Sequence, residues 1–149
     1  MKNFFLCSLV SFLLVGISSV DVVSYDGTTN EIVKARMASM KVIAANMKSL
    51  SKVSRGRESF DINEVRNMLS EIASNAAQTP ILFEVNATDP TSEAASEIWE
   101  NFQDFADKSF ALESTAKGLI STVESVDDLA VAVQSLGKTC KSCHSKYRN

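Results

Sequence analysis

The chain has 149 residues, of which 45% are hydrophobic and 22% are charged, and its formal net charge at pH 7 is −3. This length suits one domain with a single hydrophobic core, so a second domain is not expected. The acidic balance argues against nucleic acid as a binding partner.

The first residues have the layout of a secretory signal peptide. Lys2 precedes an apolar run over residues 4–15, and small residues follow at positions 16, 18 and 19. The run covers about 12 residues, whereas a spanning helix needs roughly 20, so we expect a cleaved signal and no permanent membrane span. We place the signal peptide at residues 1–18, with cleavage between 18 and 24, and the mature domain at 25–149. This predicts a periplasmic protein.

Helical periodicity then appears in four segments, and no segment keeps the alternation of a strand. The first helix is predicted over roughly 29–53, with Met40 on its apolar stripe. The second is predicted over roughly 62–77. It begins after a capping residue, Asp61, and is expected to end before Pro80.

The longest connection is expected between the second and third helices. Asp89 is predicted to cap the third helix, which then runs over roughly 91–117 and stops or bends at Gly118. A fourth helix is expected to begin near Ser125, where a capping box starts. Four amphipathic helices with short links predict an all-α fold, an antiparallel four-helix bundle.

The last predicted helix carries a C-x-x-C-H motif made of Cys140, Cys143 and His144. In an exported protein this motif is typical of covalent haem attachment: each thiol adds to one vinyl group of the haem, and the imidazole binds the iron. On a helix, residues three and four apart share a face and reach one planar ligand. His144 is the only histidine of the chain, so it is the only candidate for a histidine iron ligand.

Three other interpretations of the same motif remain open. A structural zinc site normally has four ligands, one more than the motif offers. A thioredoxin-like redox pair normally lies in a βαβ unit, not at the tail of a helical chain. A disulfide between residues three apart would close a very small loop and add little stability.

A sixth iron ligand must come from earlier in the chain, and methionine is the usual partner of histidine on an electron-transfer haem. The candidates in the mature chain are Met37, Met40, Met47 and Met68. Helical phase places Met40 on the core-facing stripe. Phase alone does not decide between an iron ligand and a packing residue, because methionine is also a common core filler.

The mature chain resembles the class II c-type cytochromes, the cytochrome c prime family, over essentially its whole length. Three blocks carry the resemblance: Arg36-Met37-Ala38-Ser39-Met40-Lys41 with Asn46-Met47, then Ile98-Trp99-Glu100 with Phe102 and Phe105, and finally the C-x-x-C-H motif with Tyr147-Arg148. The resemblance implies a four-helix bundle with one haem c bound through Cys140 and Cys143, and with His144 as the proximal ligand. Family members are often homodimers, so a homodimer is one possible assembly.

The family divides at the distal side of the haem, at the residue four after Arg36. Here that residue is Met40, which implies the low-spin branch, an electron carrier that is not an enzyme and works with redox partner proteins. The alternative is a five-coordinate cytochrome c prime that binds nitric oxide or carbon monoxide. A third possibility is a bundle with a disulfide and no haem.

The resemblance also implies roles for two arginines. Arg36 is expected to approach a haem propionate, the alternative being a solvated arginine at the edge of the bundle. Arg148 is expected near His144, where its charge would disfavour protonation of the imidazole. The alternative for Arg148 is a cation placed at a helix C-terminus by the helix dipole.

Overall fold

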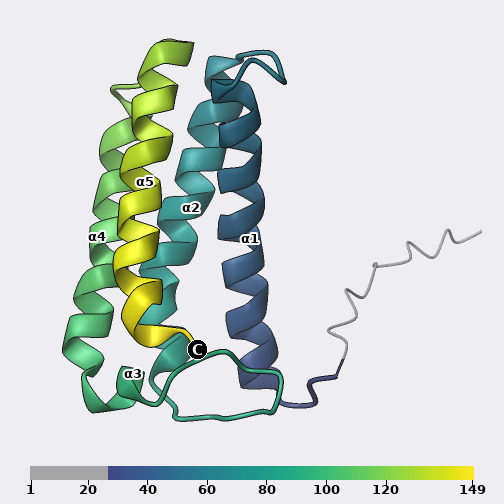
Figure 1. The fold of residues 1–149 in the computed structure, drawn as a ribbon, viewed down its shortest axis with the longest axis vertical. Coiled ribbons are helices and arrows are strands. Elements are labelled where there is room, and N and C mark those ends of the chain that lie inside the picture. The colour runs from purple at the N-terminus through teal and green to yellow at the C-terminus, as the bar shows by residue number, and fades with distance from the viewer. Residues whose placement is uncertain (1–26) are drawn as a thin grey trace, which may run out of the picture.

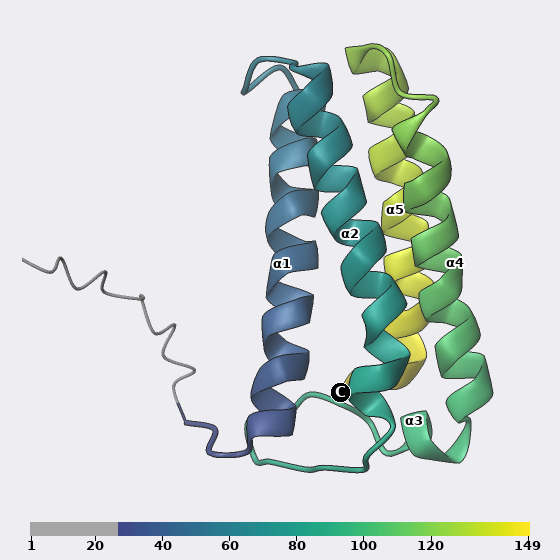
Figure 2. The same cartoon turned by 180° about the vertical axis from the view of Figure 1, so that it is seen from behind.

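The computed structural model describes residues 27–149. It contains α1 (Glu31–Ser54), α2 (Ile62–Phe83), α3 (Glu97–Glu100), α4 (Phe102–Ile120) and α5 (Val126–Tyr147). The four long helices lie side by side and α3 is a single turn before α4 (Figures 1 and 2), so the predicted antiparallel four-helix bundle is confirmed. The predicted signal peptide lies outside the described residues. Among residues 27–149, none of the helices combines the length and hydrophobicity needed to cross a membrane.

Side-chain caps fix where three of the long helices begin. The side chain of Asn30 accepts hydrogen bonds from two backbone N–H groups of the first turn of α1. Asp61 caps α2 in the same way, and the Ser125 hydroxyl accepts from the backbone N–H of Asp128 at the start of α5. These contacts satisfy N–H groups that have no partner within the helix. The starts predicted at Asp61 and Ser125 are therefore confirmed.

The predicted end of α2 is wrong, because the helix continues through Pro80 to Phe83. Proline has no backbone N–H, so the carbonyl of Ala76, four residues earlier, loses its helical partner. The Ser109 hydroxyl of α4 donates to that carbonyl at 2.8 Å in a buried contact. This bond from a neighbouring helix replaces the missing one and makes the proline tolerable inside α2.

The predicted start of the third helix is also wrong. Asp89 does not cap a helix: its carboxylate accepts hydrogen bonds from the hydroxyl of Thr28 at 2.6 Å and from the backbone N–H of Thr91 at 2.9 Å. The connection therefore extends over residues 84–96, and α4 begins only at Phe102. At its other end α4 passes Gly118 and ends at Ile120.

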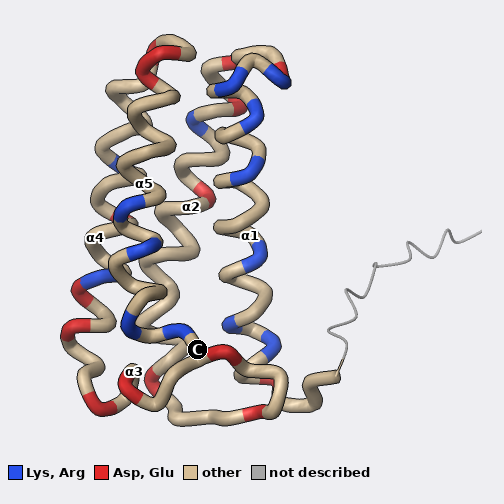
Figure 3. The backbone as a smooth tube through the Cα atoms, in the orientation of Figure 1, with Lys and Arg blue, Asp and Glu red and all other residues tan. Residues whose placement is uncertain are grey.

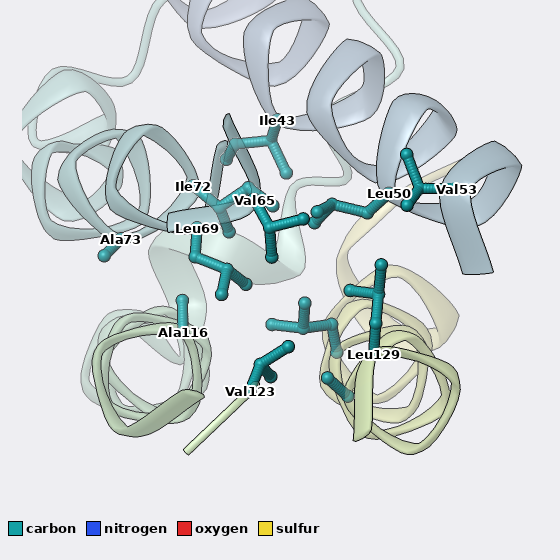
Figure 4. Close-up of a cluster of buried hydrophobic side chains, with 12 residues drawn as sticks. Ile43, Leu50, Val53, Val65, Leu69, Ile72, Ala73, Ala116, Val123 and Leu129 are labelled. Carbon is teal, nitrogen blue, oxygen red and sulfur yellow. The ribbon is translucent and has the colours of Figure 1, made fainter. Parts of the chain in front are cut away.

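The interior of the bundle consists of two clusters. The first, which we call the aliphatic core, is drawn in Figure 4 and contains Ile43, Leu50, Val53, Val65, Leu69, Ile72, Ala73, Ala116, Val123, Leu129, Ala132 and Leu136. The second, which we call the aromatic cluster, contains Phe83, Ile98, Phe105 and Tyr147, with the partly buried Leu82, Ala94, Trp99, Phe102 and Cys143 packed against it. The aromatic cluster joins the end of α5 to α3, α4 and the end of α2.

Candidate haem site

The structure places the C-x-x-C-H motif in the last turns of α5. Cys140 and Cys143 are half-buried and both are free thiols, while His144 lies on the exposed surface of the same helix. Residues at these spacings share one side of an α-helix. The three residues therefore lie together as the sequence predicts, with Cys143 packed against the aromatic cluster.

The surroundings favour the neutral forms of all three side chains. Burial raises the pKa of the Cys140 and Cys143 thiols above their ordinary value. Partial removal of the ring from water lowers the pKa of His144, the positive charge of Arg148 lowers it further, and Glu93 acts in the opposite direction. A neutral imidazole has the free lone pair that binding to a metal requires. The effect of Arg148 on His144 has the direction predicted from the sequence.

The other interpretations of the motif find little support in the structure. Cys140 and Cys143 are not joined in a disulfide. Within residues 27–149, no three His, Cys, Asp or Glu side chains gather closely enough to hold a metal ion, which leaves a zinc site without a ligand set there. The motif also lies in an all-helical part of the chain, whereas a thioredoxin-like pair would need a βαβ setting.

The chemistry and space around the motif fit a covalently bound haem. Two thiols and a neutral imidazole on one side of a helix are the donor set of a c-type haem site. Gly137, Cys140 and His144 follow at steps of three and four, so they share one stripe of α5. A Cβ added to the half-buried Gly137 would meet no atom within 4 Å, so this stripe borders open space.

The height of each methionine along the bundle separates the candidates for the sixth ligand. The start of α1 and the end of α5 lie at the same end of the bundle (Figure 1). With a rise of 1.5 Å per residue, Met40 is roughly 13 Å from the start of α1 and Cys140 roughly 10 Å from the end of α5. Met47 lies roughly 24 Å along α1, and Met68 lies near the opposite end. Met37 has a similar height to Met40, but of these two only Met40 packs against the aliphatic core.

Arg36 is buried, with 3% of its surface exposed, so the alternative of a solvated arginine is wrong. Its Nε donates to the carbonyl of Leu82 at 2.9 Å, its Nη1 donates to that of Ala87 at 2.8 Å, and its Nη2 donates to that of Val85. The guanidinium carbon lies 4.4 Å from the ring centre of Phe83. Burial lowers the pKa of Arg36, yet a guanidinium stays charged in proteins. The expected contact with a propionate stays a prediction.

We call the end of the bundle that carries the C-x-x-C-H motif the haem end. Other contacts that stabilise it were not predicted from the sequence. The Tyr147 hydroxyl donates to Asp104 of α4 at 2.5 Å, and Arg148 forms an ion pair with Glu93. The indole N–H of Trp99 donates to the carbonyl of Phe83 at 2.8 Å. The sequence shows which of these residues are aromatic, but it does not reveal their hydrogen-bond partners, because those lie far away in the sequence. The contacts of Tyr147 and Arg148 fix the end of α5 on α4 and on the loop before α3, and that of Trp99 joins α3 to the end of α2.

Comparisons of sequence and of structure with known proteins both identify cytochromes. The family described as Cytochrome C′ matches residues 31–148. Cytochrome c-556 of Agrobacterium fabrum is 34% identical over 117 residues, which cover 78% of this chain and 80% of the relative. Cytochrome c′ of Rhodospirillum rubrum is 33% identical over 89 residues, which cover 58% of this chain and 60% of the relative. The solved cytochrome c′ from Rhodopseudomonas palustris superposes with a TM-score of 0.76 and 26% identity, covering 80% of this chain and 97% of that one.

Proposed function

Since the chain belongs to the cytochrome c′ family, which binds haem c covalently, we propose that it is an exported electron-transfer protein whose iron ligands are His144 and Met40. The observation that carries this proposal is that Met40 lies at the height of the C-x-x-C-H motif, on the helix that faces α5. The protein makes no bonds in a substrate, so it is a carrier and not an enzyme.

The residues of α5 would hold the cofactor. The thiols of Cys140 and Cys143 would form the two covalent links, and the neutral imidazole of His144 would bind the iron from the same side. When bound, the haem supplies an iron that alternates between the ferrous and ferric states. Removal from water and the charge of Arg148 lower the pKa of His144, which disfavours a protonation that would compete with a bond to the metal.

The orientation of α1 supports Met40 as the sixth ligand. Ser39 lies on the side of α1 that faces α2, because its hydroxyl donates a hydrogen bond to Asn75 of α2. Met40 follows by one residue, a rotation of about 100° around the helix. It is partly buried against the aliphatic core, so its thioether points into the bundle on the side away from Asn75. Thioether ligation raises the reduction potential and keeps the coordination unchanged during electron transfer.

The gas-binding alternative requires Met40 to leave the iron or never to bind it. We propose to distinguish the two with protein produced in a cell that matures c-type cytochromes. The ferrous absorption spectrum is recorded with and without carbon monoxide, and the denatured mass is measured to establish the covalent haem. We expect sharp low-spin bands that carbon monoxide does not change. A broad high-spin spectrum that shifts with the gas would establish the alternative, and a bare polypeptide mass would contradict both.

Two leucine variants identify the ligand. Met40→Leu removes the thioether but keeps an apolar side chain, so we expect a high-spin ferrous spectrum that responds to carbon monoxide. Met47→Leu is the matched control, because Met47 lies on the same helix and also packs against the aliphatic core. It should keep the low-spin spectrum. The opposite result, with only Met47→Leu becoming high-spin, would transfer the ligand role to Met47.

The place of action is part of the same proposal. Export would deliver the chain to the periplasm and remove residues 1–18. We expect haem attachment and redox partner proteins in that compartment. The mass of the mature protein checks the cleavage, because it should correspond to a chain that begins between residues 19 and 25. Dimerisation, implied by the family, is checked by the sedimentation coefficient of the haem-loaded protein.

A further inference from the structure

The charges of the chain are strongly segregated along the sequence. Residues 32–54 and 138–149 contain nine of the 15 Lys and Arg residues and none of the 18 Asp and Glu residues. The first segment is nearly all of α1 and the second is the last part of α5 (Figure 3). The two helices that carry the proposed iron ligands are therefore basic in a protein whose net charge is negative.

On α1, the exposed lysines lie on the side away from α2. Ser39 and Asn46 mark the side that faces α2, because they hydrogen-bond to Asn75 and Glu71 of that helix. Lys41 and Lys48 each follow one of these residues by two positions, a rotation of about 200° around the helix. Within residues 27–149, the other helix that α1 contacts is α5. The two exposed lysines thus lie on the outer surface of α1, away from the interior of the bundle.

On α5, the exposed lysines lie on the outer surface of the helix, and only Lys141 lies towards α1. Ser142 marks the side that faces α4, because Lys108 of α4 donates to its hydroxyl at 3.3 Å. Lys141 precedes Ser142 by one residue, a rotation of about 100° away from that side, and it neighbours His144 on the helix surface. Lys138 precedes Ser142 by four residues, a rotation of only about 40°, so it lies on the outer surface of α5 nearer to α4. Both lysines are exposed.

These four exposed lysines form what we call the lysine face: Lys41, Lys48, Lys138 and Lys141. Among the described residues, Lys48, Lys138 and Lys141 enter none of the ion pairs. Other lysines of the same helices do, since Lys52 pairs with Glu58 and Lys146 with Asp104. Charges without a partner inside the protein attract opposite charge from outside most strongly.

We propose that the lysine face is the docking surface for an acidic redox protein, which it orients against the outer surface of α1 and of the last part of α5. This inference rests on the proposed function, because it assigns a partner to the same site. Complementary charge raises the association rate and selects one orientation in a protein pair. The negative residues elsewhere would repel the acidic partner from the other sides.

The first experiment measures the local charge during electron transfer. Ferrous haem-loaded protein is oxidised by hexacyanoferrate(III), which gains the one electron that the iron loses. If the lysine face borders the site of transfer, this anion reacts faster at low salt than at high salt, although the whole protein is negative. The cationic tris(phenanthroline)cobalt(III) should show the opposite salt dependence. The double variant Lys48→Glu/Lys138→Glu should slow the low-salt reaction with hexacyanoferrate about tenfold.

Lys117→Glu is the control. It reverses one exposed charge on α4, outside the lysine face, and should change the rate much less than Lys48→Glu or Lys138→Glu alone. The absorption spectrum of each variant is recorded first, so that a lost haem is not mistaken for a lost docking surface. If hexacyanoferrate reacts more slowly at low salt, or if all three single variants have equal effects, the proposal is overturned while the carrier function stands.

The second experiment measures binding without electron transfer. Poly-L-glutamate is titrated into the haem-loaded protein, and the amide signals are followed by NMR. We expect shifts centred on Lys48 and Lys138, and their loss in the double variant. Vesicles of phosphatidylcholine and phosphatidylglycerol are tested in parallel. Binding to these vesicles without binding to poly-L-glutamate would overturn a protein partner and indicate an anionic membrane surface instead.

Discussion

The aliphatic core and the aromatic cluster are stabilised in different ways. Leu50, Leu69, Ile72 and Leu136 of the aliphatic core have 0% of their surface exposed. Their burial is favourable in any arrangement that excludes water, because the hydrophobic effect is non-directional. The aromatic cluster instead places the rings of Phe83 and Trp99 against the buried Arg36, and the half-buried Cys143 packs against it. The first region gives the bundle its stability, and the second sets the positions of particular atoms at the haem end.

Geometry within the aromatic cluster supports this distinction. The ring of Phe105 lies 5.0 Å from that of Phe83 and 5.4 Å from that of Tyr147, the latter in an edge-on arrangement. Edge-on and tilted ring pairs are favoured by the charge distribution of aromatic rings. Hydrogen bonds from Arg36, Trp99 and Tyr147 add fixed directions to these contacts. The effects of substitutions in the aliphatic core and in the aromatic cluster should therefore differ in kind as well as in size.

The largest effect is expected from a cavity in the aliphatic core. Leu69→Ala removes a fully buried side chain and should lower the free energy of unfolding by about 3 kcal/mol. The ferrous absorption spectrum should not change, because the cavity lies away from the motif. Chemical denaturation of the haem-loaded protein measures the loss. Ile81→Ala is the control: Ile81 is 65% exposed, and its loss should cost less than about 0.5 kcal/mol. Equal losses in both variants would show that burial in the aliphatic core is not the cause of the lost stability.

Arg36 gives the next largest effect. Arg36→Met keeps the length of the side chain but leaves three carbonyls without their donor, so we expect a loss of about 2 kcal/mol. Unlike Leu69→Ala, it should act locally and raise the hydrogen exchange of residues 82–96 more than that of the aliphatic core. Arg57→Met is the control, because Arg57 is exposed in the α1–α2 connection. Uniformly faster exchange across the whole bundle would show that Arg36 does not act on this loop in particular.

A smaller effect is expected where Ser109 compensates for Pro80. Ser109→Ala removes the hydroxyl that donates to the Ala76 carbonyl and should cost about 1–2 kcal/mol. Pro80→Ala restores an N–H to α2, so Ser109→Ala should cost less in that background. Unfolding of the two single variants and the double variant by denaturant measures this coupling. If the effects of the two substitutions on the free energy of unfolding are additive, Ser109 does not compensate for the proline.

These contacts also show which features the sequence could predict. The C-x-x-C-H motif and the caps at Asp61 and Ser125 depend on residues a few positions apart, and the structure places them as expected. The end of α2 was mispredicted because its proline is compensated by Ser109, which the chain brings close only after folding. Asp89 has the residue type of a helix cap, but Thr28, 61 residues away, uses its carboxylate. The contact of Arg36 with a propionate stays a prediction, and its three carbonyl partners were missed because they lie 46–51 residues away.

The smallest effect concerns Asp89, which ties the segment before α1 to the loop. Hydrogen bonds from Thr28 and Thr91 lower the pKa of Asp89 from its ordinary value of 3.8 to about 2. A lowered pKa means that the contact stabilises the fold fully above about pH 4, and that this contribution is lost as the pH falls towards 2. We therefore expect the exchange of the Thr91 amide to accelerate over this interval, ahead of the aliphatic core.

Asp89→Asn separates this titration from general acid unfolding. An amide keeps an oxygen that accepts a hydrogen bond but has no proton to gain, so exchange at Thr91 should be faster than in the natural chain above pH 4 and should not depend on titration at this position. NMR-detected hydrogen exchange of both proteins between pH 5 and 2 makes the comparison. If both proteins lose protection at Thr91 together with the aliphatic core, the loop has no separate response to acid, because the contact then contributes only to the stability of the whole bundle.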